Sequence, residues 1–470
     1  MKTPRGLLVA LCVACGLSGS ALAGDRVVSV PLPSGGDDTA AIQSALDECV
    51  SHGPGCTVQL DAGTYLTKQL FAKDFHGTFK GRGMDVSIIQ ALPNLPVSQD
   101  NPVWQNPPTA DNKYPMLVLF FGGDVTVADM TIRALEAHQL QEWFIHEDYR
   151  TTYMWAVLEF MGQSEAMDVV VTRVALVGAY AESGPEYSGG YNATGLAIDP
   201  YPTVYYPPPG HLSGTFRISA SRFDTFVEAM GAAALGESRL AIGGSPSEAN
   251  VFQNSACAAI LLDLDSSTVD FSHNDVRVSG PLAFGGFVAW QAALGPVAAP
   301  SSFLVQRNRI KATGSNQDGI WLVDYGTLFG EGKTGDFVIS NNDITIEPSQ
   351  GWPAYAGIET VFTEGTTISN NRIRGRGLFG IAVEGATQAM VKANNVEKVA
   401  ADFVPIGLMT ADVPTTDSTV VGFGKKTNVY DEEGNNTLVG VNNVQGNPPG
   451  PAIRDAMKRK MEMIKSLRVR

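Results

Sequence analysis

Short apolar stretches recur along most of this chain, and asparagine marks the turn that accompanies many of them. In each such repeat an Asn is followed two residues later by an apolar side chain, and successive Asn residues lie 23 to 34 positions apart. A pattern that repeats every 20 to 50 residues or so indicates a solenoid or an array of similar units. The Asn residues of the pattern are Asn250, Asn274, Asn308, Asn342, Asn371, Asn394 and Asn428.

The spacing varies, so we expect one corner of each unit to be fixed while a loop elsewhere changes length. This is typical of a parallel β-helix, in which each coil forms one rung. Asn suits the fixed corner because it tolerates a left-handed backbone and can hydrogen-bond the equivalent Asn of the next rung. In the coil around Asn342, the pattern predicts three strands, at 336–340, 344–346 and 357–361.

The third strand of each coil recurs ten times in this interpretation. At about 4.8 Å per rung, ten coils make a rod about 48 Å long. Side chains alternate along each strand, so that one set packs inside and the other faces outward. The predicted fold class is all-β, a single parallel β-helix of about ten coils spanning 24–450. The ten strands are expected to begin near Met116, Ala156, Leu196, Val227, Ile260, Phe287, Ile320, Ile358, Ile381 and Ile406.

A helix is predicted near the start, over 37–52. An Asp or Thr at 37–39 can cap it, and Ile42, Leu46 and Val50 recur at every fourth position to make an apolar face. A strand at 57–60, a turn, and a second short strand follow.

The stretch DDTAAIQSALDEC…TVQLDAGTYL, within 37–66, resembles the N-terminal segment of the pectin-lyase-like right-handed β-helix superfamily. That group includes pectate-lyase-type proteins and phage tailspike-like domains. The resemblance implies that the helix caps the open N-terminal end of the solenoid and that the coils are right-handed. It also implies that strands such as 357–361 line a substrate groove. Neither this motif nor the Asn pattern identifies an activity.

The first 23 residues have the features of a cleaved signal peptide. Lys2 and Arg5 precede an apolar run from Leu7 to Cys15, and a small-residue cleavage site ends at Ala23. No later stretch is apolar enough to span a bilayer. We therefore expect a secreted or periplasmic protein without a transmembrane segment. In that setting Cys49 and Cys56, seven positions apart across a turn, are expected to form a disulfide.

The tail at 451–470 has a different composition from the rest of the chain. Seven Lys or Arg residues accompany two acidic ones, and apolar residues fall at helical spacing. We expect a basic amphipathic helix that packs on the last rung, closing an exposed sheet edge, or on another subunit in a homo-oligomer. A helix lying on a membrane surface is the alternative. The apolar positions are Ile453, Met457, Met461, Ile464 and Leu467.

Long insertions, at 92–115, 136–154, 176–194 and 200–213, are rich in aromatic residues. Loops on a rigid scaffold often carry function, and aromatic faces can stack on sugar rings. We expect Trp143, Tyr191 and Tyr205 to be sugar platforms, with His146, Arg150 and Tyr153 as further substrate contacts. The alternative is that these side chains only pack the loops onto the solenoid.

The outward positions of the predicted groove strands carry an acidic series. Matching positions on neighbouring rungs lie about 5 Å apart and those on alternate rungs about 10 Å, near the carboxyl separations of retaining and inverting glycoside hydrolases. Like charges this close raise a pKa and place an acid beside a base. A calcium site and a solvated acidic face are the alternatives. The series is Glu159, Asp199, Glu228, Asp263, Glu359 and Glu384.

The leading functional prediction is an enzyme that cleaves a polysaccharide with paired carboxylates. Glu159, Asp199 and Asp263 are the predicted acid, base or nucleophile. A non-catalytic glycan-binding solenoid and a calcium-dependent lyase are the alternatives, and calcium is the cofactor that the last of these implies. A lyase is less favoured, because few basic residues lie near the groove strands. The formal charge of −15 argues against nucleic acid as a partner.

Overall fold

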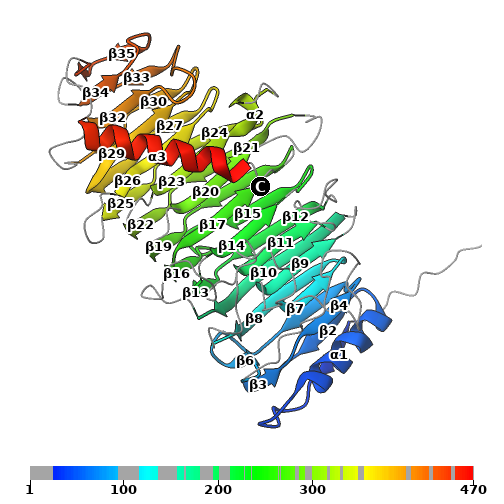
Figure 1. The fold of residues 1–470 in the computed structure, drawn as a ribbon. Helices are drawn as coiled ribbons and strands as arrows, with labels where there is room; N and C mark the ends of the chain where they lie inside the picture. The colour runs from blue at the N-terminus through cyan, green and yellow to red at the C-terminus, as the bar shows by residue number, and fades with distance from the viewer. Residues whose placement is uncertain are drawn as a thin grey trace, which may run out of the picture.

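The computed structural model describes a solenoid of parallel strands flanked by three helices (Figure 1). The described residues are 25–93, 116–135, 156–162, 166–179, 194–200, 212–226, 228–233, 235–262, 264, 266–280, 285–291, 299–314, 318–328, 332–347, 354–397, 404–422, 427–445 and 450–468. Their strands form a 13-stranded sheet and a 23-stranded sheet, and every strand pair is parallel.

The 13-stranded sheet runs along one face of the solenoid, and its strands follow one another in chain order. They are β4 (Leu70–Lys73), β7 (Met116–Phe121), β9 (Ala156–Gly162), β11 (Thr194–Pro200), β14 (Glu228–Ala233), β17 (Cys257–Leu262), β20 (Gly285–Gln291), β23 (Asp318–Asp324), β26 (Ala354–Val361), β29 (Gly377–Glu384), β32 (Val404–Met409), β34 (Asn428–Asp431) and β36 (Asn442–Asn443).

The 23-stranded sheet takes two strands from most coils and wraps the other side. Its strands are β1 (Arg26–Ser29), β2 (Cys56–Gln59), β3 (Gly63–Thr67), β5 (Gly77–Lys80), β6 (Ser87–Ala91), β8 (Val125–Arg133), β10 (Ala166–Val177), β12 (Ser213–Ser219), β13 (Arg222–Asp224), β15 (Arg239–Gly243), β16 (Val251–Ser255), β18 (Thr268–Ser272), β19 (Asp275–Gly280), β21 (Ser301–Gln306), β22 (Arg309–Gly314), β24 (Gly335–Ser340), β25 (Asp343–Glu347), β27 (Thr367–Ser369), β28 (Arg372–Gly375), β30 (Met390–Lys392), β31 (Asn395–Val396), β33 (Thr419–Val421) and β35 (Thr437–Val439).

The prediction of three strands per coil is confirmed, for example by β24, β25 and β26 in the coil around Asn342. The ten predicted third strands correspond to β7 through β32 of the 13-stranded sheet. The described chain extends that sheet beyond the prediction by β4 at one end and by β34 and β36 at the other. These terminal strands have two to four residues, too few to display a clear alternating pattern.

The interior is filled by apolar side chains that stack on their equivalents in neighbouring coils. The rings of Phe223 and Phe252 have centroids 4.6 Å apart, and those of Phe303 and Phe337 lie 5.0 Å apart. Equivalent positions stack because parallel strands in register place them one rung apart. The core is therefore a set of columns running the length of the solenoid.

The Asn residues form a buried ladder at one corner, from Asn250 to Asn394. Each side-chain Nδ2 donates to the Oδ1 of the next Asn at 2.9–3.1 Å. Each backbone N–H donates to that same oxygen at 3.0–3.3 Å. The predicted bond between rungs is thus present. Asn428 is an exception, because it lies in β34 and bonds Asn442 instead.

From Asn274 onward, the expected left-handed conformation belongs to the residue before each ladder Asn. His273, Arg307 and Asn341 have φ of 60°, 55° and 58°, and each precedes a ladder Asn. The prediction that the Asn itself is left-handed was wrong by one position. The preceding residue makes the turn, and the Asn side chain then bonds the neighbouring coils.

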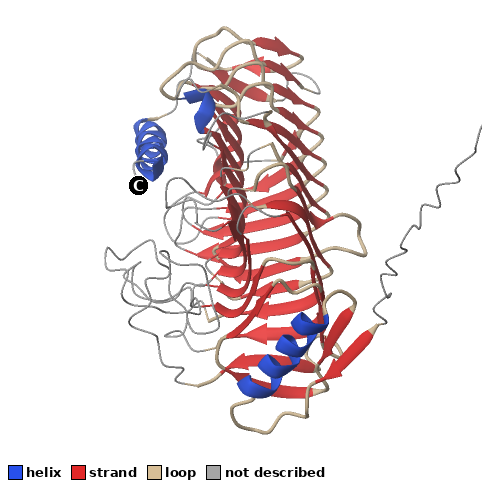
Figure 2. Cartoon of the chain, turned by 90° about the vertical axis from the view of Figure 1, so that its right-hand side faces the viewer, coloured by secondary structure: helices blue, strands red, loops and turns tan. Residues whose placement is uncertain are grey.

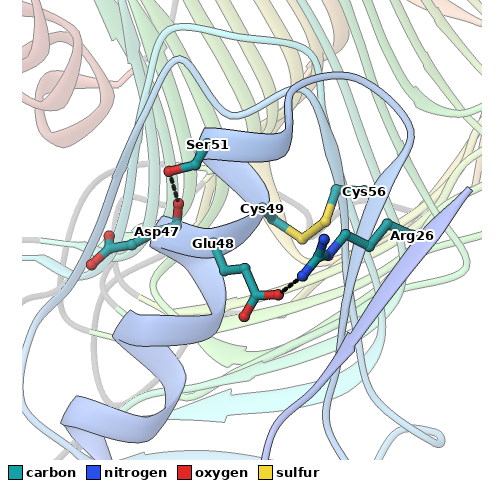
Figure 3. Close-up of a disulfide and its surroundings, with 6 residues drawn as sticks. All are labelled: Arg26, Asp47, Glu48, Cys49, Ser51 and Cys56. Atoms are coloured by element: carbon teal, nitrogen blue, oxygen red, sulfur yellow. Dashed lines mark hydrogen bonds and ion pairs between the residues drawn. A yellow bond between two sulfur atoms is a disulfide. The ribbon is translucent and has the colours of Figure 1, made fainter. Parts of the chain in front are cut away.

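Helix α1 (Thr39–His52) covers the N-terminal end of the solenoid, as the resemblance implied (Figure 2). It begins two residues later than predicted, with Asp38 as N-cap, and buries Ile42 and Leu46. The predicted disulfide joins Cys49 of α1 to Cys56 at the start of β2, with Cα atoms 5.3 Å apart (Figure 3). It fastens the cap to the first coils.

The two other helices are α2 (Tyr325–Leu328) and α3 (Pro451–Arg468). Helix α3 lies alongside the solenoid, across the face formed by β29, β26 and β23 (Figures 1 and 2). It does not close the end at the last rung, which corrects that alternative of the prediction. No helix among the described residues is long and apolar enough to cross a membrane.

We expect Asn308→Ala to destabilise the fold by about 3 kcal/mol, because it leaves buried groups without partners. Asn308 Oδ1 accepts two bonds from Asn274, and its Nδ2 donates to the Phe271 carbonyl at 2.8 Å. Urea unfolding would measure the loss. The control is Asn428→Ala, which removes an exposed Asn outside the ladder and should change stability by less than about 0.5 kcal/mol. Equal effects of the two substitutions would contradict a structural role for the ladder.

Candidate functional site

The outward side chains of the 13-stranded sheet are mostly buried. They form apolar clusters separate from the main core, such as the one containing Met116, Leu119 and Met161. Glu159, Asp199, Glu359 and Glu384 lie on this same face, and all four are at most 7% exposed. The alternative of a solvated acidic face is therefore wrong for these four residues.

The register of β9 and β11 determines the relative positions of Glu159 and Asp199. Glu159 pairs with Ala197, whereas Asp199 pairs with Met161. The two acids therefore sit on neighbouring rungs but are offset by two residues along the strand. From rung spacing and strand rise, their Cα atoms are about 8 Å apart. The prediction of matched positions about 5 Å apart does not hold for this pair.

Glu159 is an unusual side chain for a protein interior. It is 0% exposed, and neither carboxyl oxygen has a hydrogen-bond partner among the described residues. Burial raises the pKa of Glu159 well above its ordinary value, and the nearby Asp199 charge raises it further. Burial without a partner thus favours the protonated form of Glu159, since an unpaired buried carboxylate is costly.

The pKa of Asp199 is also raised, but less than that of Glu159. Burial raises the pKa of Asp199 to about 7, so that near neutral pH it exists in both protonation states. One carboxyl that holds its proton thus lies beside another that can lose it. Two acids whose environments separate their pKa values in this way can divide general acid and general base roles.

A third carboxyl belongs to the same region. Glu228, a member of the predicted acidic series, starts β14 and pairs with Thr194. Its Oε1 lies over Gly231, only 2.1 Å from where a Cβ would stand, so a side chain at Gly231 would collide with it. Gly231 pairs with Ala197, which in turn pairs with Glu159. Small residues thus form the floor between Glu159, Asp199 and Glu228, which we call the acidic site.

The remaining predicted site residues lie outside the described part of the chain. These are Asp263, the expected third catalytic carboxyl, and the expected substrate contacts Trp143, His146, Arg150, Tyr153, Tyr191 and Tyr205. The structure therefore neither supports nor contradicts their predicted roles.

A second cluster on the same face surrounds a lysine of α3. Lys460, 6% exposed, forms ion pairs with Asp318 of β23 and Glu359 of β26. Its Nζ lies 4.6 Å from the ring centroid of Trp321 and 4.2 Å from that of Tyr355. The Tyr355 hydroxyl donates a hydrogen bond to Glu384 of β29. We call Asp318, Trp321, Tyr355, Glu359 and Glu384 the lysine nest.

The nest holds three carboxyls against one cation. Burial raises the pKa of Asp318 and, more strongly, that of Glu359, while Lys460 works in the opposite direction on both. Burial raises the pKa of Glu384 to about 7. For Lys460, burial lowers the pKa, but the two paired carboxylates outweigh it and raise the pKa overall. Lys460 is therefore charged in the nest.

Sequence reasoning identified Glu359 and Glu384 but missed Asp318, Tyr355 and Lys460. A signal for Lys460 was present, because it falls three residues after Met457 on the apolar stripe of the tail helix. Met457 and Met461 pack against the outer apolar clusters on either side of the nest. Asp318 precedes its strand's apolar run and carries no comparable signal.

The calcium alternative finds no site in the described residues. Nowhere in that part of the chain do three or more His, Cys, Asp or Glu side chains gather in a way that could hold a metal ion.

We expect the stability of the wild type to fall as pH rises from about 4 to about 7. Below about pH 4, near the ordinary pKa of Asp, Asp199 is protonated in both folded and unfolded chains. Between these values the unfolded chain ionises while the folded chain keeps its proton, so the stability is lost as pH passes through the folded pKa of about 7. Asp199→Asn should make this fall shallower. Thermal unfolding at several pH values measures both proteins, and parallel profiles would contradict the raised pKa.

The comparisons with known proteins concern the fold. Residues 297–458 match the family model described as "Right handed beta helix region". No curated protein matches the chain by sequence.

Solved structures with a similar course of the chain share little sequence with it. The mannuronan C-5 epimerase AlgE6 A-module of Azotobacter vinelandii is 13% identical, with 92% of this chain and 98% of that one covered and a TM-score of 0.49. DFA-IIIase from Arthrobacter chlorophenolicus A6 without its lid is 12% identical (88% and 98% covered, TM-score 0.47). The Streptococcus pneumoniae surface protein and adhesin PfbA is 13% identical (84% and 100% covered, TM-score 0.44).

Similarity at this level says nothing about activity. The family match and the two all-parallel sheets are the observations that bear on the fold. They confirm the predicted parallel β-helix fold, and the family match supports right-handed coils over 297–458.

Proposed function

We propose that this protein is exported and acts on a polysaccharide, with Glu159 and Asp199 as its acid–base pair. The observation that carries the proposal is the pair itself, two buried carboxyls on the outward side of the 13-stranded sheet with different raised pKa values. Such pairs are the working groups of glycoside hydrolysis. The unpartnered oxygens of Glu159 support it further, because a fold stabilised only by packing has no use for them.

The difference between the pKa values of Glu159 and Asp199 assigns the general acid and general base roles. Glu159 holds its proton and donates it to the glycosidic oxygen as the bond to the anomeric carbon breaks. Asp199, when ionised, takes a proton from the water whose oxygen forms the new bond at that carbon. One water is consumed, and proton exchange with solvent restores both carboxyls. Glu228 is the third carboxyl within reach of this site.

The offset of the two acids favours inversion over retention. Inverting enzymes place their carboxyls about 6.5–9.5 Å apart, whereas retaining enzymes need about 5–5.5 Å. From the strand geometry, the Cα atoms of Glu159 and Asp199 are about 8 Å apart, wider than the spacing of about 5 Å between matched positions on neighbouring rungs, which favours the larger carboxyl separation. The proposed substrate is a neutral glycan, because acidic side chains disfavour a polyuronate.

A second candidate function, glycan binding without turnover, is favoured by the burial of the pair. Glu159 is 0% exposed and Asp199 7%, so catalysis requires that substrate binding opens this face. A binding solenoid needs no such opening. In either case, the aromatic residues of 136–154, 176–194 and 200–213 remain the predicted sugar contacts. The Cys49–Cys56 disulfide supports export, since such bonds persist in oxidising compartments.

An activity screen on neutral and acidic polysaccharides, with and without calcium, tests the proposal. We expect new reducing ends without ultraviolet absorbance. Glu159→Gln and Asp199→Asn should each lower the rate about 100-fold or more, because each removes a proton-transfer group while keeping its shape. Glu347→Gln, an exposed acid on the 23-stranded sheet that pairs with Lys311, is the matched control and should keep full activity.

The other outcomes separate the alternatives. Absorbance that disappears with a chelator would replace the hydrolase with a calcium-dependent lyase. Binding to a glycan without any turnover, unchanged in Asp199→Asn, would favour the binding solenoid. Turnover that survives both carboxyl substitutions would contradict the proposed roles of Glu159 and Asp199.

A further inference from the structure

The lysine nest is built as a receptor for an ammonium group. Asp318 and Glu359 pair with Lys460 Nζ, and the rings of Trp321 and Tyr355 lie within 4.6 Å of it. Carboxylates and aromatic faces are the groups that recognise ammonium ions, by charge and by the negative potential of the ring face. All five nest residues come from the sheet, whereas the cation comes from the separate helix α3.

The nest is also pre-formed independently of α3. Asp318 accepts a hydrogen bond from the Ala356 backbone N–H at 2.8 Å, and Tyr355 bonds Glu384. Trp290 packs edge-on against Trp321, with ring centroids 5.1 Å apart. These contacts lie within the sheet, so removal of Lys460 should leave the carboxyls and the aromatic rings of the nest in place.

Few of the described side chains of α3 are buried against this face. Among its side chains that the structure describes, Lys460 is the one that is buried, and Met457 and Met461 are half-buried. Arg454, Asp455, Lys458 and Arg459 are exposed. Among the described side chains of α3, the ion-paired Lys460 is thus the buried contact with the sheet, and a ligand that brings its own ammonium competes with it directly.

The nest contains a hydrogen-bond donor that has no acceptor among the described residues. The indole Nε1 of Trp321 is buried and has no hydrogen-bond partner among the described residues. A buried N–H without an acceptor is unfavourable, so a ligand that carries an acceptor beside its ammonium would satisfy it. An amino sugar has this arrangement, since hydroxyl oxygens flank its amine and its ring can lie on the aromatic faces.

We propose that the lysine nest is a binding site for the ammonium group of an amino sugar, and that Lys460 of α3 occupies it as an internal competitor. The site is distinct from the acidic site at Glu159 and does not depend on the proposed hydrolysis. Helix α3 then covers the face of β23, β26 and β29 until an amine-bearing glycan displaces it.

Calorimetric titration of the full-length chain with a glucosamine trimer tests the proposal. Lys460→Ala should bind the trimer at least about tenfold more tightly than the wild type, because the competitor is gone. Lys458→Ala, an exposed lysine on the same helix, is the matched control and should behave as the wild type. The double variant Lys460→Ala with Glu359→Gln should lose the gain.

Two further ligands identify what the nest recognises. The N-acetylated trimer, which lacks the charge, should not distinguish Lys460→Ala from the wild type. Butylammonium should bind Lys460→Ala more weakly than the glucosamine trimer does. Equal binding of butylammonium and the trimer would overturn the amino-sugar assignment, and no gain for any amine in Lys460→Ala would overturn the site itself.

The wild type provides a test that does not depend on the folding of a variant. Hydrogen exchange of the backbone at 454–462 should accelerate when the glucosamine trimer is added, while exchange in the strands stays unchanged. The N-acetylated trimer should have no such effect. Unchanged exchange of α3 at saturating glucosamine trimer would overturn the proposal that α3 is displaced.

Discussion

The structure depends on the hydrogen bonds between equivalent residues of successive coils. These bonds pair the strands in parallel with the equivalent strands of neighbouring coils. Because the register is fixed, each side chain sits one rung from its equivalent, and like residues form columns. The Phe stacks of the core and the Asn ladder of the corner are two results of this single constraint.

The same constraint explains why the outer face of the 13-stranded sheet has unusual electrostatics. Acids placed on successive coils come close together, and the apolar clusters around them exclude water. Each carboxyl then loses solvation and feels its neighbours, so its pKa rises. Two clusters of such buried carboxyls lie among the described residues of this face. In the acidic site burial favours the protonated forms of Glu159 and Asp199, and in the lysine nest a cation from α3 neutralises part of the carboxyl charge.

The two clusters differ in what a ligand would have to do. At the acidic site, Glu159 offers a proton and two oxygens that have no hydrogen-bond partner in the described part of the chain, which suits chemistry on a neutral glycan. At the lysine nest the charge is already paired, so a ligand must replace Lys460 to gain access. The helix that provides Lys460 crosses the face over β29, β26 and β23 (Figure 1). An ion pair contributed by the tail therefore controls access to the C-terminal half of this face.

The sequence by itself determined the solenoid, its three strands per coil, the capping helix and the Cys49–Cys56 bond. All of these rest on local pattern or short spacing, namely the Asn repeat, the alternation of apolar residues, and two cysteines seven positions apart. It also placed Glu159 and Asp199 on the outer face, because alternation along a strand is a local property. Only the tertiary structure decided their offset, since register between coils depends on loop lengths that vary from coil to coil. It alone also joined Lys460 to Asp318, 142 positions earlier, because a contact between a tail and a distant strand leaves no periodic signal in either segment.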